Sequence, residues 1–225
     1  MTAVAGTLTA GDVLADGSTT DADVLNATLT TAGTVAASVT NIETINLDVK
    51  TATAGLNLAS VSGAKALNVN TNTAIAAALD NVNTANAPTI GLKGSGVLTV
   101  NTTSLAGTTA GGNAESLSVK LDGANTSGTG AAIQRAGLTL DTAVAGALET
   151  LNLESAGAAK NTLVLALDAV GTVPTGITKT VVTGAADLDL LTANAVITGQ
   201  TLDASAHTGA MNLSVDRNGA VLAAT

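Results

Sequence analysis

Three short stretches of the chain follow one pattern: NIETINL at 41–47, AESLSVKL at 114–121 and ALETLNL at 147–153. In each, a glutamate precedes a segment in which every second residue is aliphatic, as Ile45 and Leu47 are in the first. Alternation with this period predicts a β-strand that turns one face into a core. Successive turns of a parallel β-helix place equivalent strands side by side, so a recurring strand favours stacked rungs over hairpins.

The rest of the chain also predicts short strands joined by turns. Residues 65–69 and 138–140 alternate in the same way, and Gly, Asn, Ser, Thr and Asp fill the intervals between such segments. Long helical periodicity is not found. We therefore expect an all-β fold, a parallel β-helix (β-solenoid) with irregular loops, which forms a single elongated domain over residues 1–225. These residues could also be one segment of a longer chain.

The composition indicates a thin interior. Hydrophobic residues make up 46% of the chain, yet Phe, Tyr and Trp are absent. Such a core must be filled by Ala, Val, Leu, Ile and the methyl groups of Thr, so its layers must lie close together to avoid voids.

The charge balance excludes one class of partner and favours another. Eight Lys and Arg stand against seventeen Asp and Glu, a formal net charge of −9. Nucleic-acid phosphates need clustered cations, so we expect no nucleic-acid binding, whereas calcium suits an acidic surface. Cysteine is absent, which rules out disulfides and thiolate metal sites. No apolar run approaches the roughly 18 residues of a membrane helix, so we expect no membrane insertion.

The glutamates Glu43, Glu115 and Glu149 share the inward parity of the aliphatic residues that follow them. A carboxylate deep in an aliphatic core would be very costly, so these residues should lie at a corner of the solenoid. There they could accept hydrogen bonds from turn N–H groups or help to bind a cation.

A second group of carboxylates lies near the N-terminus. Asp12, Asp16, Asp21 and Asp23 fall within twelve residues that also contain Gly and Thr. Closely spaced carboxylates in a turn supply the oxygen ligands that calcium requires. The alternative is an acidic loop that is simply solvated.

Two segments resemble known surface proteins. In residues 5–49, Gly11-Asp12 and Asp23 to Leu25 flank a glycine-containing turn, and the strand Glu43 to Leu47 follows. This arrangement resembles the repeated unit of large surface-layer (S-layer) and repeats-in-toxin-like adhesins of Gram-negative bacteria. Residues 181–216 resemble the segment that often precedes calcium-binding nonapeptides in such proteins.

The resemblance implies a secreted, calcium-dependent, right-handed β-helix that assembles into a surface lattice and is exported by a type I system. This chain departs from the pattern because it contains no Gly-Gly-x-Gly-x-Asp nonapeptide; Asp16-Gly17 stands where Gly-Gly would be expected.

Two alternatives to a structural protein remain open. A flat ladder of Thr-x-Thr motifs can bind ice, and four such motifs, at 7–9, 28–30, 51–53 and 71–73, lie 20 to 23 residues apart. Parallel β-helices also include enzymes that act on polysaccharides. However, Arg135 and Arg217 are the only arginines, His207 is the only histidine, and aromatic platforms for sugars are missing.

We therefore expect a non-enzymatic, self-assembling structural protein of the extracellular cell surface, an S-layer or filament subunit. Calcium is the expected cofactor, held by the aspartates and glutamates named above. The expected partners are copies of the same chain and cell-surface polysaccharide.

Overall fold

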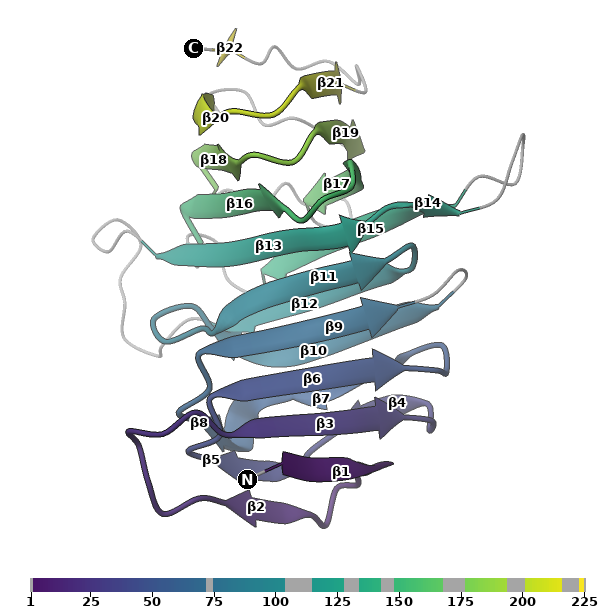
Figure 1. Cartoon of the computed structure of the whole chain (residues 1–225), viewed down its shortest axis with the longest axis vertical. Coiled ribbons are helices and arrows are strands. Elements are labelled where there is room, and N and C mark those ends of the chain that lie inside the picture. Colours follow the sequence, from purple (N-terminus) through teal and green to yellow (C-terminus); the bar gives the residue numbers. More distant parts are fainter. Residues whose placement is uncertain are drawn as a thin grey trace.

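The computed structural model describes residues 2–71, 75–103, 115–127, 134–142, 148–167, 177–193, 201–215 and 223–224. Within these ranges the chain coils into stacked rungs, so that strands far apart in sequence lie side by side (Figure 1). None of the described residues forms a helix long and apolar enough to cross a membrane.

The first sheet has ten strands, which follow one another in chain order. All pair in parallel. They are β1 (Thr2–Thr7), β3 (Val24–Leu29), β6 (Thr44–Val49), β9 (Ala66–Thr71), β11 (Thr89–Gly94), β13 (Ser116–Ala124), β16 (Thr150–Ala156), β18 (Lys179–Gly184), β20 (Thr201–His207) and β22 (Ala223–Ala224).

The second sheet contributes a strand to most of the same rungs. Its parallel strands are β4 (Gly33–Val35), β7 (Ala54–Asn57), β10 (Ala76–Asn83), β12 (Val97–Thr103), β15 (Gln134–Thr142), β17 (Asn161–Leu167), β19 (Leu188–Ala193) and β21 (Met211–Val215). The short β14 (Thr126–Ser127) pairs antiparallel with β15.

A third, short sheet of β2 (Val13–Ala15), β5 (Ser38–Thr40) and β8 (Val61–Ser62) closes the rungs at the N-terminal end. A 3₁₀ turn over Leu58–Ser60 precedes β8. The predicted all-β, parallel β-solenoid is therefore confirmed, and its right-handed sense stays a prediction.

The core consists of aliphatic side chains stacked in columns. In β6 the burial alternates, and Ile45, Leu47 and Val49 are each at most 2% exposed. Backbone pairing places Ile45 beside Leu67, and Leu67 beside Ile90. Each rung thus presents the same face to its neighbours, and branched aliphatic chains fill the narrow space without aromatic rings.

The three glutamate-headed strands do not stack in a single register. Ile90 of β11 pairs with Val119 of β13, so Ile45 shares its column with Val119 rather than with Leu117. The glutamate at the head of β13 is therefore displaced by two residues from the column of Glu43. A shift of two keeps the inward parity, which explains why the sequence pattern survives it.

Asn161, at the start of β17, is a fully buried polar residue in the C-terminal half. Its Oδ1 accepts hydrogen bonds from the N–H groups of Gly123 and Ala124, each at 3.1 Å, in the preceding rung. Its Nδ2 donates to three oxygens: Ser155 Oγ (2.9 Å), Ala156 C=O (2.9 Å) and Leu121 C=O (3.3 Å). One side chain thus satisfies backbone groups that a corner of the solenoid leaves unpaired.

Replacing Asn161 with Ala should lower the free energy of unfolding by about 2 to 4 kcal/mol, because the N–H groups of Gly123 and Ala124 lose their acceptor. Urea unfolding measures the change. The control Asn212→Ala removes an exposed amide from β21 and should change stability by less than about 0.5 kcal/mol. Equal unfolding midpoints for the two variants would contradict this account.

Candidate functional site

Three of the predicted aspartates meet in the loop between β2 and β3. One carboxylate oxygen from each of Asp16, Asp21 and Asp23 lies within 4.8 Å of the others. Asp21 is exposed, Asp16 is partly exposed, and Asp23 is only 3% exposed. This acidic triad could hold a metal ion, because two ligands about 2.4 Å from one ion lie at most about 4.8 Å apart.

Backbone hydrogen bonds attach the triad to the rungs. Asp16 N–H donates to Thr40 C=O at 3.0 Å, and Asn41 Nδ2 donates to Asp16 C=O at 3.2 Å. The Asp16 carboxylate itself accepts a hydrogen bond from Ser18 N–H. These contacts fix one member of the triad against the third sheet, whose β5 ends at Thr40.

Asp12, the fourth predicted aspartate, does not belong to the triad. Its Oδ2 accepts a hydrogen bond from Thr9 N–H at 2.8 Å, and its own N–H donates to Thr9 C=O at 3.1 Å. Asp12 therefore stabilises the turn that leads into β2.

Glu43 lies at a corner, beside the triad but with a different partner. It is 5% exposed, and its Oε2 accepts a hydrogen bond from Asp23 N–H at 2.9 Å. Its backbone carbonyl accepts from Lys65 N–H and Ala66 N–H in the next rung. A buried carboxylate with a backbone donor fits the predicted structural role of the glutamate, and it also anchors the backbone of a triad residue.

Glu115 and Glu149 form a second carboxylate pair, each one residue before the start of β13 and β16, respectively. Glu149 Oε2 accepts a hydrogen bond from Glu115 N–H at 2.8 Å, the same contact that Glu43 makes with Asp23. Burial raises the pKa of the Glu149 carboxyl above its ordinary value. The side chain of Glu115 raises it further through a hydrogen bond and its negative charge, while the Glu115 N–H opposes both effects.

The raised pKa of Glu149 makes a pH-dependent prediction. The folded state holds the proton of Glu149 more tightly than the unfolded state, so ionising this carboxyl lowers the free energy of unfolding. This loss of stability is absent below the unfolded pKa of about 4.3. The loss grows as the pH rises through the folded pKa. Glu149→Gln keeps an acceptor for Glu115 N–H without the charge. It should therefore be more stable than the wild type at pH 7, by less than about 1 kcal/mol because solvent screens the pair.

Urea unfolding of both proteins at pH 4 and pH 7 measures this effect. The stability difference should shrink at pH 4, because the Glu149 carboxyl of the wild type loses charge as the pH falls. A difference that is equal at both pH values would show that charge is not its cause.

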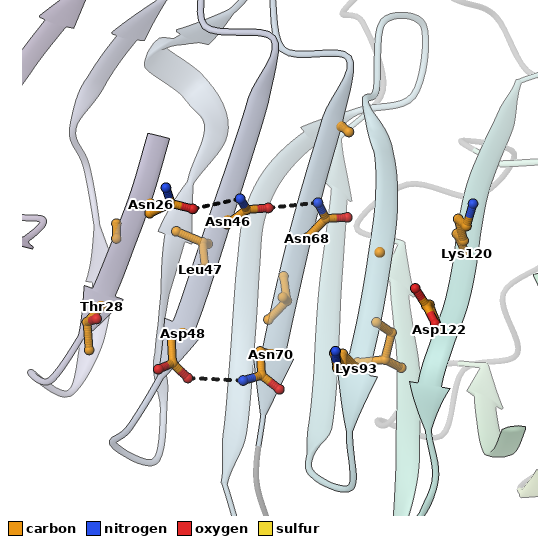
Figure 2. Close-up of a pocket in the computed structure, with 15 residues that line it drawn as sticks. Asn26, Thr28, Asn46, Leu47, Asp48, Asn68, Asn70, Lys93, Lys120 and Asp122 are labelled. Atoms are coloured by element: carbon orange, nitrogen blue, oxygen red, sulfur yellow. Dashed lines mark hydrogen bonds between the residues drawn. The ribbon is translucent and has the colours of Figure 1, made fainter. Parts of the chain in front are cut away.

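The outer face of the first sheet carries a long trough, which we call the outer-face trough (Figure 2). Its volume is about 790 Å³. Two rows of outward side chains form its walls, and the strand backbone at inward residues such as Leu47 and Val69 forms its floor. The first row is Asn26, Asn46, Asn68, Gly91 and Lys120; the second is Thr28, Asp48, Asn70, Lys93 and Asp122.

The first row begins as a ladder of amides. Asn46 Nδ2 donates to Asn26 Oδ1 at 2.7 Å, and Asn68 Nδ2 donates to Asn46 Oδ1 at 2.8 Å. In the second row, Asn70 Nδ2 donates to Asp48 Oδ1 at 3.2 Å. Figure 2 shows these contacts running from strand to strand. Identical amides on adjacent parallel strands can repeat such a bond, because each amide has both a donor and an acceptor.

The trough was not predicted from the sequence, although a signal is present. Asn26, Asn46 and Asn68 each stand one residue after an inward aliphatic residue: Leu25, Ile45 and Leu67. An outward asparagine at the same place in three consecutive rungs identifies an amide column once the register is known.

Some of the Thr-x-Thr threonines are in contact, whereas the arginine and the histidine weighed for an enzyme lie on different sheets. Thr7 pairs with Thr28, and Asp48 takes the next place in that column. Thr51 Oγ1 donates to Thr30 C=O at 2.8 Å, so the second and third Thr-x-Thr motifs are in contact. Arg135 lies on β15 of the second sheet and His207 on β20 of the first. Thr73 and Arg217 lie outside the described residues.

No protein-family model matches the chain, and no curated protein or solved structure is significantly similar to it. The resemblance to S-layer and repeats-in-toxin-like proteins is therefore supported only at the level of the β-solenoid fold.

Proposed function

We propose that this chain is a non-enzymatic structural protein of the extracellular cell surface, a subunit that assembles with its own copies into a lattice or filament in a calcium-dependent manner. Cell-surface polysaccharide is the second proposed partner. The net charge of −9 supports the choice of partners, because it disfavours nucleic acid and favours a divalent cation.

The observation that carries the proposal is the continuous parallel order of the first sheet. Among the described strands, β1 and β22 stand at its two ends, and each has one neighbour. A strand with one neighbour offers backbone N–H and C=O groups to a strand of another molecule. Copies that meet end to end would extend the same hydrogen-bond ladder, and a solenoid is therefore suited to ordered assembly.

The acidic triad supports the calcium dependence. Three carboxylates so close together repel one another, and a cation bound among them would relieve that repulsion. Calcium accepts six to eight oxygen ligands in a flexible geometry, so carboxylates from an irregular loop can be combined with carbonyls and water. A cation at Asp16, Asp21 and Asp23 would join the loop to β3 near the N-terminal end of the first sheet.

Electron microscopy and light scattering of the purified chain test this proposal. We expect a monomer in chelator and ordered sheets or filaments as calcium is added, with magnesium as the control ion. Asp16→Asn together with Asp21→Asn should raise the calcium concentration needed for assembly at least about tenfold, since two charged ligands are lost.

The matched control is Glu154→Gln together with Asp189→Asn. It removes the same number of charges from exposed pairs with Lys120 and Lys160. This control should assemble like the wild type. A monodisperse wild-type monomer at every calcium concentration would reject calcium-driven assembly, and equal behaviour of the two double variants would reject the triad as its site.

A further inference from the structure

We propose that the outer-face trough is a binding site for an extended, uncharged polysaccharide strand that lies along the solenoid axis. This assigns a site to the polysaccharide partner proposed above. It does not require assembly or calcium, so it can be tested on the monomer.

The shape of the trough favours a polymer over a compact ligand. Its walls run across five consecutive strands of the first sheet, β3, β6, β9, β11 and β13. With about 4.8 Å between strands, the trough is about 19 Å long. Each rung adds further polar groups at the same spacing, so a chain with repeating hydroxyl groups can make repeating contacts.

The walls present groups that hydroxyls can bind. An Asn amide has two N–H donors and an oxygen with two lone pairs, and the ladder uses only part of this capacity. Asn46 and Asn68 are already held by their neighbours at 2.7 and 2.8 Å, so little side-chain entropy remains to be lost on binding. Neighbouring sugar hydroxyls can both donate to and accept from such amides.

Gly91 contributes backbone but no side chain to the first wall. It pairs with Asn68 on one side and with Lys120 on the other, so it interrupts the column where another side chain would stand. A Cβ at this position would lie 2.2 Å from Asn68 Oδ1. The Asn68 amide oxygen therefore lies over Gly91, in the place where a side chain would begin. Asn68 is exposed and residue 91 has no side chain to cover this last oxygen of the ladder, so a sugar hydroxyl can reach it.

The charges of the trough favour an uncharged ligand. Asp48 and Asp122 balance Lys93 and Lys120 among the lining residues, and the whole chain has a net charge of −9. Lys120 Nζ also lies 3.5 Å from Glu154 Oε1, and Asp48 Oδ2 lies 2.8 Å from Lys50 Nζ. A polyanion would meet overall repulsion and only partly available cations.

The missing aromatic residues set the expected strength of binding. Without rings to stack on sugars, an oligosaccharide must bind through hydrogen bonds made in competition with water, and these contribute little net free energy each. We expect a dissociation constant on the order of 1 mM for one trough, which corresponds to weak binding. Many troughs on one assembled surface would raise the avidity.

The test is an NMR titration of the ¹⁵N-labelled chain in chelator with maltoheptaose, cellohexaose and mannohexaose, and with oligogalacturonate as the anionic comparison. At least one neutral oligosaccharide should shift the amide signals of β6, β9 and β11 with saturation. The proposal is overturned if none of them shifts these signals at about 10 mM, or if oligogalacturonate binds more tightly than all of them.

Gly91→Asn is the decisive variant, because its side chain would displace the Asn68 amide oxygen that lies over the glycine and would cover this part of the trough. The displaced atom is the end of an exposed side chain, so the shift disturbs the hydrogen bond from Asn68 to Asn46 and leaves the backbone ladder in place. This variant should weaken oligosaccharide binding at least about tenfold while its unfolding midpoint stays near that of the wild type.

Thr99→Asn, which places the same side chain on β12 of the second sheet outside the trough, is the matched control and should bind normally. If Gly91→Asn does not fold, Asn70→Ala truncates the second wall without adding volume and should also weaken binding. Undiminished binding by the folded Gly91→Asn variant, or by Asn70→Ala in its place, would overturn the assignment. Because calcium is absent throughout, failure of binding is distinguished from failure of calcium-driven assembly.

Discussion

The parallel backbone ladder is the constraint on which the rest of this structure depends. Its hydrogen bonds hold neighbouring strands about 4.8 Å apart and keep the same side-chain parity from rung to rung, apart from local irregularities in four of the strand pairs. Along the regular parts of the ladder an inward residue lies against the inward residues of the rungs before and after it, as Ile45 does against Leu67. Branched aliphatic side chains fit this repeated spacing, which is why a chain without aromatic residues can still build a continuous core.

The same spacing imposes a rule on polar side chains, because each column brings like positions together. Asparagines satisfy the rule, since each amide can donate to the one before it, as Asn46 does to Asn26. Glutamates satisfy it poorly. Glu149 reaches the N–H of Glu115, but burial and then the carboxyl group of Glu115 raise the pKa of Glu149. The fold accepts this cost at the corners because backbone donors there need acceptors.

Strand alternation was enough to predict the all-β solenoid and its inward residues from the sequence, because parity is a local property of the chain. The register between rungs was not predictable in the same way. Glu43 and Glu115 head similar strands, yet the backbone pairing puts Ile45 in the column of Val119. Glu115 therefore lies two residues away from the column of Glu43. Parity is unchanged by a shift of two, so no local pattern reports it.

The candidate site was predictable to a similar extent. Asp16, Asp21 and Asp23 are close in sequence, so their meeting in one loop followed from their spacing. The outer-face trough joins residues from five strands, and the buried role of Asn161 joins a side chain to backbone groups in another rung. Both depend on the register of the coil. Asn161 is buried and Asn68 is exposed, yet the neighbouring residues in the sequence do not distinguish the two asparagines.

The composition of one outward column explains why the trough lies where it does. The column begins with the amides of Asn26, Asn46 and Asn68, and beyond Gly91 it continues with Lys120 and Glu154. Stacked amides bind one another or a carboxylate, as Asn70 binds Asp48, whereas Lys120 pairs with the carboxylate of Glu154. Gly91 stands between the amides and this ion pair, on the strand before β13, and the Asn68 amide oxygen lies over it. The first row of the trough is thus lined by short amides and a glycine up to the strand where long charged side chains begin.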